Sequence, residues 1–223
     1  MKKSDLLLLL FLAALFLPFM LSTSLFQAYD EFNKAHGMIM SFIKFGILAT
    51  LGELIGQRIR TGNYFNKNFG ILPKAIIWGF LGLTINMAFV LFSKGTPAFL
   101  AYLGFDVSRT DGFALFLIAF SISTLMNLIY APVMMTLHAI TDRHVQAHQG
   151  RLSALYNGIR FGEIMQAMDW RRQWSFVFAR TIPFFWIPAH TITFLLPTEF
   201  RVLFAAILGI VLGIILALAS RKQ

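Results

Sequence analysis

The sequence predicts an all-α bundle that crosses a membrane six times, and three features support this fold class. Of the 223 residues, 57% are apolar and only 13% are charged, with a mean hydropathy of +0.70. Because a soluble domain must cover its surface with polar groups, this composition is typical of a chain that meets lipid. The apolar residues also form six runs, each near the roughly 20 residues that span a bilayer. Lys and Arg lie mostly between these runs.

The predicted spans leave no room for a separate soluble domain, so residues 1–223 are predicted to form one membrane domain. We place the spans at residues 6–26, 38–57, 71–92, 113–140, 174–196 and 200–220. The first run follows two lysines, as in a signal peptide, but it is longer than the usual apolar region of one. We therefore expect residues 1–27 to be an uncleaved signal anchor, with cleavage near Ser22 as the alternative, and residues 38–220 to be a five-span bundle.

Positive charge alternates along the chain. When Lys74 and Arg201, at the ends of two spans, are counted with the adjoining stretches, the first, third, fifth and seventh stretches hold thirteen Lys and Arg residues. The second, fourth and sixth stretches hold four. The positive-inside rule therefore places both termini on the cytoplasmic side of a cell's inner (plasma) membrane, or of an organelle's inner membrane in a eukaryote. This distribution accounts for the net charge of +9 without nucleic acid, for which no binding motif is present.

The longest stretch between spans, residues 141–173, repeats apolar residues such as Leu152, Leu155 and Ile159 at helical spacing, with charged residues between them. This pattern predicts an amphipathic helix on the cytoplasmic interface. In the following span, Pro183 and Pro188 predict a kink, which is either structural or placed beside a cavity.

Small residues at helical spacing mark faces on which membrane helices pack closely. The predicted packing residues are Gly52, Gly56, Ala205, Gly209, Gly213 and Ala217. The last four repeat every four residues, which indicates a close-packed face inside the bundle or between protomers.

Polar residues within the spans are the candidates for a functional site, because an ionised group at mid-bilayer costs about 2.5–3.5 kcal/mol. Glu53 and Arg180 lie at similar predicted depths, so we predict that they pair across two helices. Lys44 lies on the opposite face of its helix and is predicted to reach outward. The residues predicted to line a pore or face the interior are Glu53, Gln57, Asn86, Asn127, His138, Arg180 and His190. Taken singly, such residues more often form interhelical contacts with no role in transport.

Sequence motifs for catalysis are absent. The chain has no cysteine, so thiol chemistry and disulfides are excluded. His144 and His148 have a spacing that can hold a metal, but no further ligands follow at a usual spacing. No HExxH, GxSxG, Walker A or dinucleotide-binding motif occurs. We therefore predict no catalytic residue, metal or cofactor, and an interfacial enzyme that uses this His-containing loop is the third-ranked interpretation.

The C-terminal third carries a set of residues seen together in one membrane family. They are Trp186, Pro188, Phe194, Pro197 and Arg201, preceded by a Gly52-Glu53-Leu-Ile-Gly-Gln57 segment and by Tyr130-Ala131-Pro132. Together they resemble the peroxisomal membrane protein family that includes small mitochondrial inner-membrane proteins. The resemblance covers roughly residues 40–220.

The chain departs from this family at several positions. Glu53 stands where the family has Asp, His190 stands where it has Gln, and Ile187 splits the Trp-Pro pair. The resemblance therefore implies a distant, prokaryotic-type member with one helix added before the family's usual four spans. It also implies a role in forming pores for small solutes or in sustaining organelle homeostasis.

We therefore expect an integral membrane protein that is channel- or pore-like for small solutes or ions. The alternative is a non-transporting scaffold that acts through helix–helix or lipid contacts. The expected partners are the lipid bilayer, a second copy of the chain, and an unidentified small solute.

Overall fold

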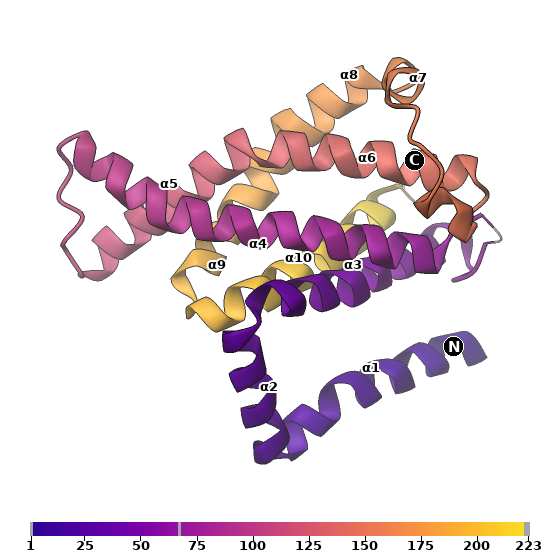
Figure 1. Cartoon of the computed structure of the whole chain (residues 1–223), viewed down its shortest axis with the longest axis horizontal. Coiled ribbons are helices and arrows are strands. Elements are labelled where there is room, and N and C mark those ends of the chain that lie inside the picture. Colours follow the sequence, from indigo (N-terminus) through magenta and orange to yellow (C-terminus); the bar gives the residue numbers. More distant parts are fainter. Residues whose placement is uncertain (1, 67, 221–223) are drawn as a thin grey trace.

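The computed structural model describes residues 2–66 and 68–220, apart from the side chains at 216, 219 and 220. Lys67, Arg221 and Lys222, which contribute to the charge alternation, lie outside the described residues. All regular elements in the described part of the chain are helices, and Figure 1 shows them as a bundle with an N-terminal arm. The predicted all-α class is confirmed.

Three long helices form the centre of the bundle. α3 (Gly37–Thr61) lies between α4 (Ile71–Tyr102) and α10 (Thr198–Ser220) and contacts both along much of its length (Figure 1). Contacts of Gly52 with Ile210 and of Gly56 with Gly213 show that α3 and α10 run in the same direction, whereas α4 runs in the opposite one.

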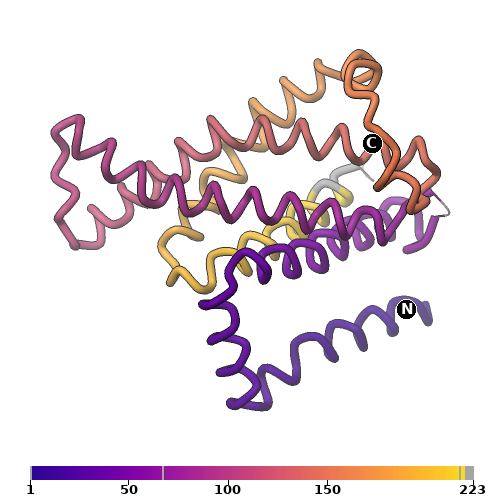
Figure 2. Tube along the Cα trace, viewed as in Figure 1, coloured from indigo at the N-terminus to yellow at the C-terminus, as the bar shows by residue number. Residues whose placement is uncertain are grey.

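The remaining helices complete the bundle as two pairs, each of two helices that follow one another directly. α5 (Gly112–Ile129) is followed directly by α6 (Ala131–Ala147), and the chain returns through the π-helix η2 (Gln173–Trp186) and α9 (Ile187–Leu195). Figure 2 traces this path from magenta through orange to yellow. The break between α5 and α6 falls beside Pro132 in the first turn of α6, since proline has no N–H to continue the helical hydrogen bonding.

The N-terminal arm consists of α1 (Lys3–Leu21) and α2 (Thr23–Ala35), which meet at an angle at Ser22 (Figure 1). Ser22 has extended backbone angles, and its hydroxyl accepts a hydrogen bond from the Leu25 N–H, which caps α2. The start of α1 is held against the end of α3, where the Asp5 carboxylate accepts hydrogen bonds of 2.9 and 3.0 Å from Arg58.

Interhelical contacts group the connecting segments at two ends of the bundle. Asp5 pairs with Arg58, and Lys74 pairs with Asp142, at one end. At the other end Asn33 donates to the Glu199 carbonyl at 3.2 Å. The segments with many Lys and Arg residues therefore share one end, as alternating crossings require.

Five helices are long and apolar enough to cross a membrane, judged by length and composition over the described residues. They are Lys3–Leu21, Gly37–Thr61, Ile71–Tyr102, Gly112–Ile129 and Thr198–Ile215. An integral, multi-pass membrane protein is therefore indicated. The sixth predicted crossing, residues 174–196, is divided between η2 and α9 at Trp186 and stays a prediction.

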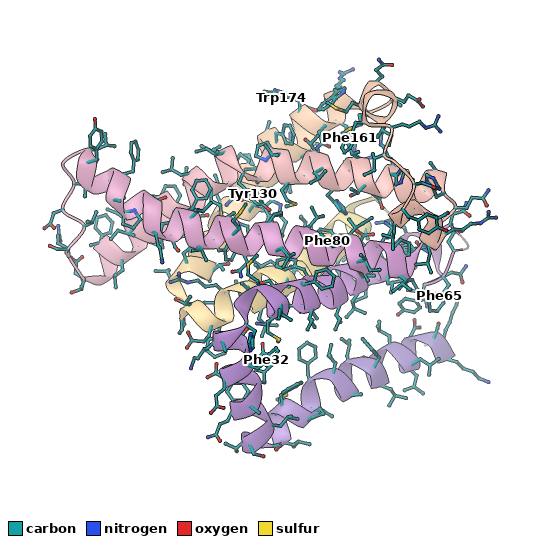
Figure 3. The ribbon with its side chains drawn as sticks, viewed as in Figure 1. Phe32, Phe65, Phe80, Tyr130, Phe161 and Trp174 are labelled. Carbon is teal, nitrogen blue, oxygen red and sulfur yellow. The ribbon has the colours of Figure 1, made fainter. Side chains whose placement is uncertain are left out.

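Apolar side chains occupy both the core and the outside of the bundle. The core contains Phe45, Leu48, Ile85, Phe89 and Met126, all buried between the helices. Large apolar side chains are also exposed along the outer faces, as at Phe80, which is 59% exposed and is labelled in Figure 3. Such an outer surface is stable in lipid rather than in water.

The predicted amphipathic helix within residues 141–173 is wrong. α6 continues to Ala147, and three short helices follow: η1 (Leu152–Leu155), α7 (Phe161–Gln166) and α8 (Trp170–Arg172). Gly150 has φ +69°, and a Cβ there would lie 2.6 Å from the Gly70 backbone N. This close approach holds the loop against the start of α4, because only glycine fits there. The positive φ of Gly150 also separates α6 from the short helices that follow.

Candidate functional site

A group of charged and aromatic side chains joins α3, α4 and α6 near one end of the bundle. We call Glu53, Lys74, Trp78, His138 and Asp142 the Glu53 cluster. One Glu53 oxygen accepts hydrogen bonds from Trp78 Nε1 at 2.7 Å and from His138 Nε2 at 3.1 Å. The other oxygen accepts from Lys74 Nζ at 2.5 Å, and Lys74 also binds the Asp142 carboxylate.

Each helix supplies its side chains to this cluster through helical spacing. Lys74 and Trp78 lie four residues apart on α4, and His138 and Asp142 lie four residues apart on α6, so each pair shares one helix face. The Trp78 and His138 rings contact each other, with centroids 4.4 Å apart. Glu53 therefore sits where three helices meet, and Lys74 bridges it to Asp142.

The cluster combines strong burial of its cation with partial exposure of its acids. The Lys74 side chain is 8% exposed, compared with 21% for Glu53, 26% for Asp142 and 30% for His138. Two carboxylates face one ammonium, so the formal charge is −1 when His138 is neutral. A small cavity of about 10 Å³ borders the cluster, which is close to the space of one water molecule.

The predicted pairing of Glu53 with Arg180 is wrong. The ion pairs of Glu53 are with Lys74 and His138. Arg180 lies on η2, is exposed, and makes no ion pair with another described residue. Predicted depth does not identify the partner of Glu53, because Lys74 is counted with the loop charges although α4 begins three residues before it.

A second polar cluster lies between α5 and α9. Asn127 is fully buried, and its side-chain amide lies 3.0 Å from His190 Nδ1 and donates to the Ser123 carbonyl at 2.8 Å. The Ser123 hydroxyl donates to the Ile187 carbonyl at 2.7 Å, and the His190 ring stacks on Trp186. These contacts satisfy the side chains of Ser123 and Asn127, whereas the buried Trp186 Nε1 has no hydrogen-bond partner among the described residues. The cluster joins α5 to α9.

The other predicted interior residues lie apart from the Glu53 cluster. Gln57 is buried and donates to the Tyr64 carbonyl at 3.1 Å, which fixes the loop after α3. Asn86 lies 3.3 Å from Met38 Sδ, next to the start of α3. The prediction that Lys44 reaches outward is wrong, since it is 6% exposed and donates to Asn33 at 2.5 Å. The contact with α2 explains this, because α2 covers that face of α3.

The predicted small residues form a seam between α3 and α10, with one exception. A Cβ on Gly52 would lie 2.9 Å from Ile210 Cα, and one on Gly213 would lie 3.2 Å from the Gly52 carbonyl oxygen. Gly56 also faces Gly213, and Ala205 and Ala217 are buried. Gly209 differs, because a Cβ there would meet nothing within 4 Å.

The residues of the family-like motif hold the turn between α9 and α10. Arg201 donates to the carbonyls of Leu196 and Phe194 at 3.0 Å each, which satisfies groups left free at the end of α9. Phe194 is buried in the core, and Pro188 occupies the first turn of α9 beside Trp186. Pro197 precedes α10. The motif therefore positions a helix–helix turn.

The two histidines with metal-like spacing bind backbone carbonyls. His144 Nε2 lies 3.0 Å from the Ala154 carbonyl, and His148 Nδ1 lies 2.9 Å from the His144 carbonyl. Among the described residues, no three His, Asp or Glu side chains are grouped as metal ligands.

Three members of the Glu53 cluster were missed by sequence reasoning. Lys74 and Asp142 lie at the ends of predicted spans and are counted with the loops, and Trp78 lies among the apolar residues of the span at 71–92. The four-residue spacing of Lys74 and Trp78 was the available signal, because it places a cation and an N–H donor on one helix face.

Comparisons with known proteins identify no relative of this chain. No family model, no curated protein and no solved structure matches the chain. The chemistry of the site therefore rests on its own residues.

Proposed function

We propose that this protein is a channel-like transport protein for small polar solutes or ions, with both termini on the cytoplasmic side. In this proposal the Glu53 cluster forms the narrow point of the path. The observation that carries it is a charged cluster on three helices of a membrane bundle, beside a small cavity. Ionisable groups inside membrane bundles mark solute and ion pathways.

The packing of the Glu53 cluster supports a path that is closed at this point in the structure. The adjoining cavity of about 10 Å³ is too small for more than about one water molecule. Lys74 occupies the space between the two carboxylates. A permeating cation would compete with the Lys74 ammonium for the same oxygens, so the cluster would select by charge. The family resemblance implies the same class of function.

Solute and ion flux into liposomes tests this proposal. The comparison is between wild type, Glu53→Gln and the matched control Glu163→Gln, which removes an exposed acid on α7. We expect Glu53→Gln to change cation flux by about fivefold, which corresponds to a change of roughly 1 kcal/mol in the free-energy barrier to permeation. We expect the flux of Glu163→Gln to equal that of wild type. Asp142→Asn provides the same test if Glu53→Gln folds poorly. Absence of flux through folded wild type in a scan of ions and small solutes would refute the proposal.

A scaffold function is the second candidate, and one observation favours it. The face of Gly209 on α10 is open, although the neighbouring small residues are packed against α3. An open small-residue face on a membrane helix allows another helix to approach closely. If Gly209→Leu abolishes an oligomer of the purified protein and wild type carries no flux, the scaffold function replaces the channel.

A further inference from the structure

A wide-open apolar groove of about 380 Å³ lies between α6, α7 and η2. Val133, Thr136, Leu137 and Ile140 of α6 line one wall, and Met165 of α7 and Phe178 of η2 line the other. The Thr136 hydroxyl donates to the Pro132 carbonyl at 2.7 Å, so it presents no free donor to the groove. Within the bilayer, such a groove is filled by an apolar chain rather than by water.

The groove arises because η2 diverges from α6. Figure 1 shows the two helices separating toward the end that carries α7 and α8. η2 is wound as a π-helix over Gln173–Trp186, whereas π-winding is usually a single turn and is often found at functional sites. The α6 wall from Val133 to Ile140 is about 10 Å long, which matches part of an acyl chain in one leaflet.

The end of the groove near the membrane surface is cationic. Arg143 follows Ile140 by three residues on α6, so it continues the lining face, and it donates to the Ala167 carbonyl at 2.6 Å. Arg171 and Arg172 are exposed at the end of α8, directly before η2. These three arginines form no ion pair with an acid in the described parts of the chain. Asp169 accepts a hydrogen bond from the Arg172 backbone N–H.

Aromatic residues at the arginine-containing end of the groove indicate that this end lies at the level of the lipid headgroups. Trp174 is 69% exposed at the start of η2, near the corner formed by α7 and α8 (Figure 3). Trp170 is 40% exposed, and its indole N–H donates to the Met165 carbonyl at 2.8 Å. Exposed tryptophans are typical of the membrane–water interface.

We propose that this groove is a binding site for an anionic phospholipid. One acyl chain lies between α6 and η2, and the phosphate group binds Arg143, with Arg171 and Arg172 beside it. Guanidinium groups bind phosphate through two parallel hydrogen bonds, and the free donors of Arg143 lie directly beyond the apolar wall. This site is separate from the Glu53 cluster and does not depend on transport.

Native mass spectrometry of the purified full chain tests this proposal. The probes are phosphatidylglycerol and phosphatidylcholine with identical acyl chains. We expect wild type to retain phosphatidylglycerol preferentially, and Arg143→Gln to weaken its binding about fivefold. The matched control is Arg60→Gln, which removes an exposed arginine on α3 outside the groove lining. Equal retention of both lipids by wild type would overturn the proposal.

A groove-filling variant separates acyl-chain binding from simple charge attraction. Val133 is 67% exposed, so Val133→Trp fills the groove without crowding the core. We expect it to weaken retention of phosphatidylglycerol while all three arginines remain. If Val133→Trp has no effect, or if inorganic phosphate displaces the lipid, the arginines bind an anion alone and the acyl-chain site is wrong. Loss of preference in Arg60→Gln would place the site elsewhere.

Discussion

Lys74 is the residue on which the charged cluster depends. It is nearly buried and stands between the carboxylates of Glu53 and Asp142. A buried charge is tolerated only when it is paired and hydrogen-bonded. Removal of the ammonium would leave two acids facing each other near the same small cavity, whereas removal of one acid would still leave Lys74 a partner.

We therefore expect Lys74→Met to lower the free energy of unfolding by about 3 kcal/mol, the usual effect of breaking a buried pair. Thermal or denaturant unfolding of the purified protein in detergent measures this loss. Arg109→Met is the control, because Arg109 and Asp111 form an exposed pair, 61% and 45% exposed, which is worth less than about 1 kcal/mol. Equal losses in the two variants would show that the Glu53 cluster is not a stabilising ion pair.

At the scale of elements, small residues bring α3 and α10 into close contact along one seam. Gly52 and Gly213 let the backbones touch, because neither has a side chain to separate them. In lipid this packing drives association, since burying apolar side chains away from water contributes nothing between helices. The neighbouring Gly209 lies outside the seam and provides an internal comparison.

Alanine substitutions at Gly52 and Gly209 are expected to change the free energy of unfolding in opposite directions. Gly52→Ala forces its methyl group against the Ile210 backbone at 2.9 Å, so stability should fall by about 1–3 kcal/mol. Gly209→Ala meets open space and should raise stability by up to about 1 kcal/mol, because alanine favours the helix. Unfolding of both variants in the same detergent measures the difference. A destabilising Gly209→Ala would indicate that a second protomer packs on that face.

At the scale of the whole molecule, the bundle places alternate connecting segments at opposite ends. The α3–α4 loop and the loop after α6 meet at Gly70 and Gly150. The α4–α5 loop lies at the far end of α4, as the trace in Figure 2 shows. This arrangement supports the six-crossing topology, including the composite crossing of η2 and α9.

Cysteine labelling tests this topology directly, because the natural chain contains no cysteine. Asn63→Cys, Thr110→Cys and Asn157→Cys each place one thiol at an exposed position in a different loop. We expect a membrane-impermeant maleimide to label Thr110→Cys in intact cells. The other two variants should react only after permeabilisation. Labelling of Thr110→Cys and Asn157→Cys from the same side would contradict a crossing by α5 and α6.

The α-helical class, the multi-pass character and the approximate spans follow from the sequence, because hydropathy and span length are properties of local composition. The small-residue stripe of α10 was also visible, since helical spacing fixes which residues share a face. The partners of the buried charges were decided only by the tertiary structure. Glu53 binds Lys74 rather than Arg180, and Lys44 binds Asn33, because which helices become neighbours depends on the packing of the whole bundle. Depth along one helix carries no information about that packing.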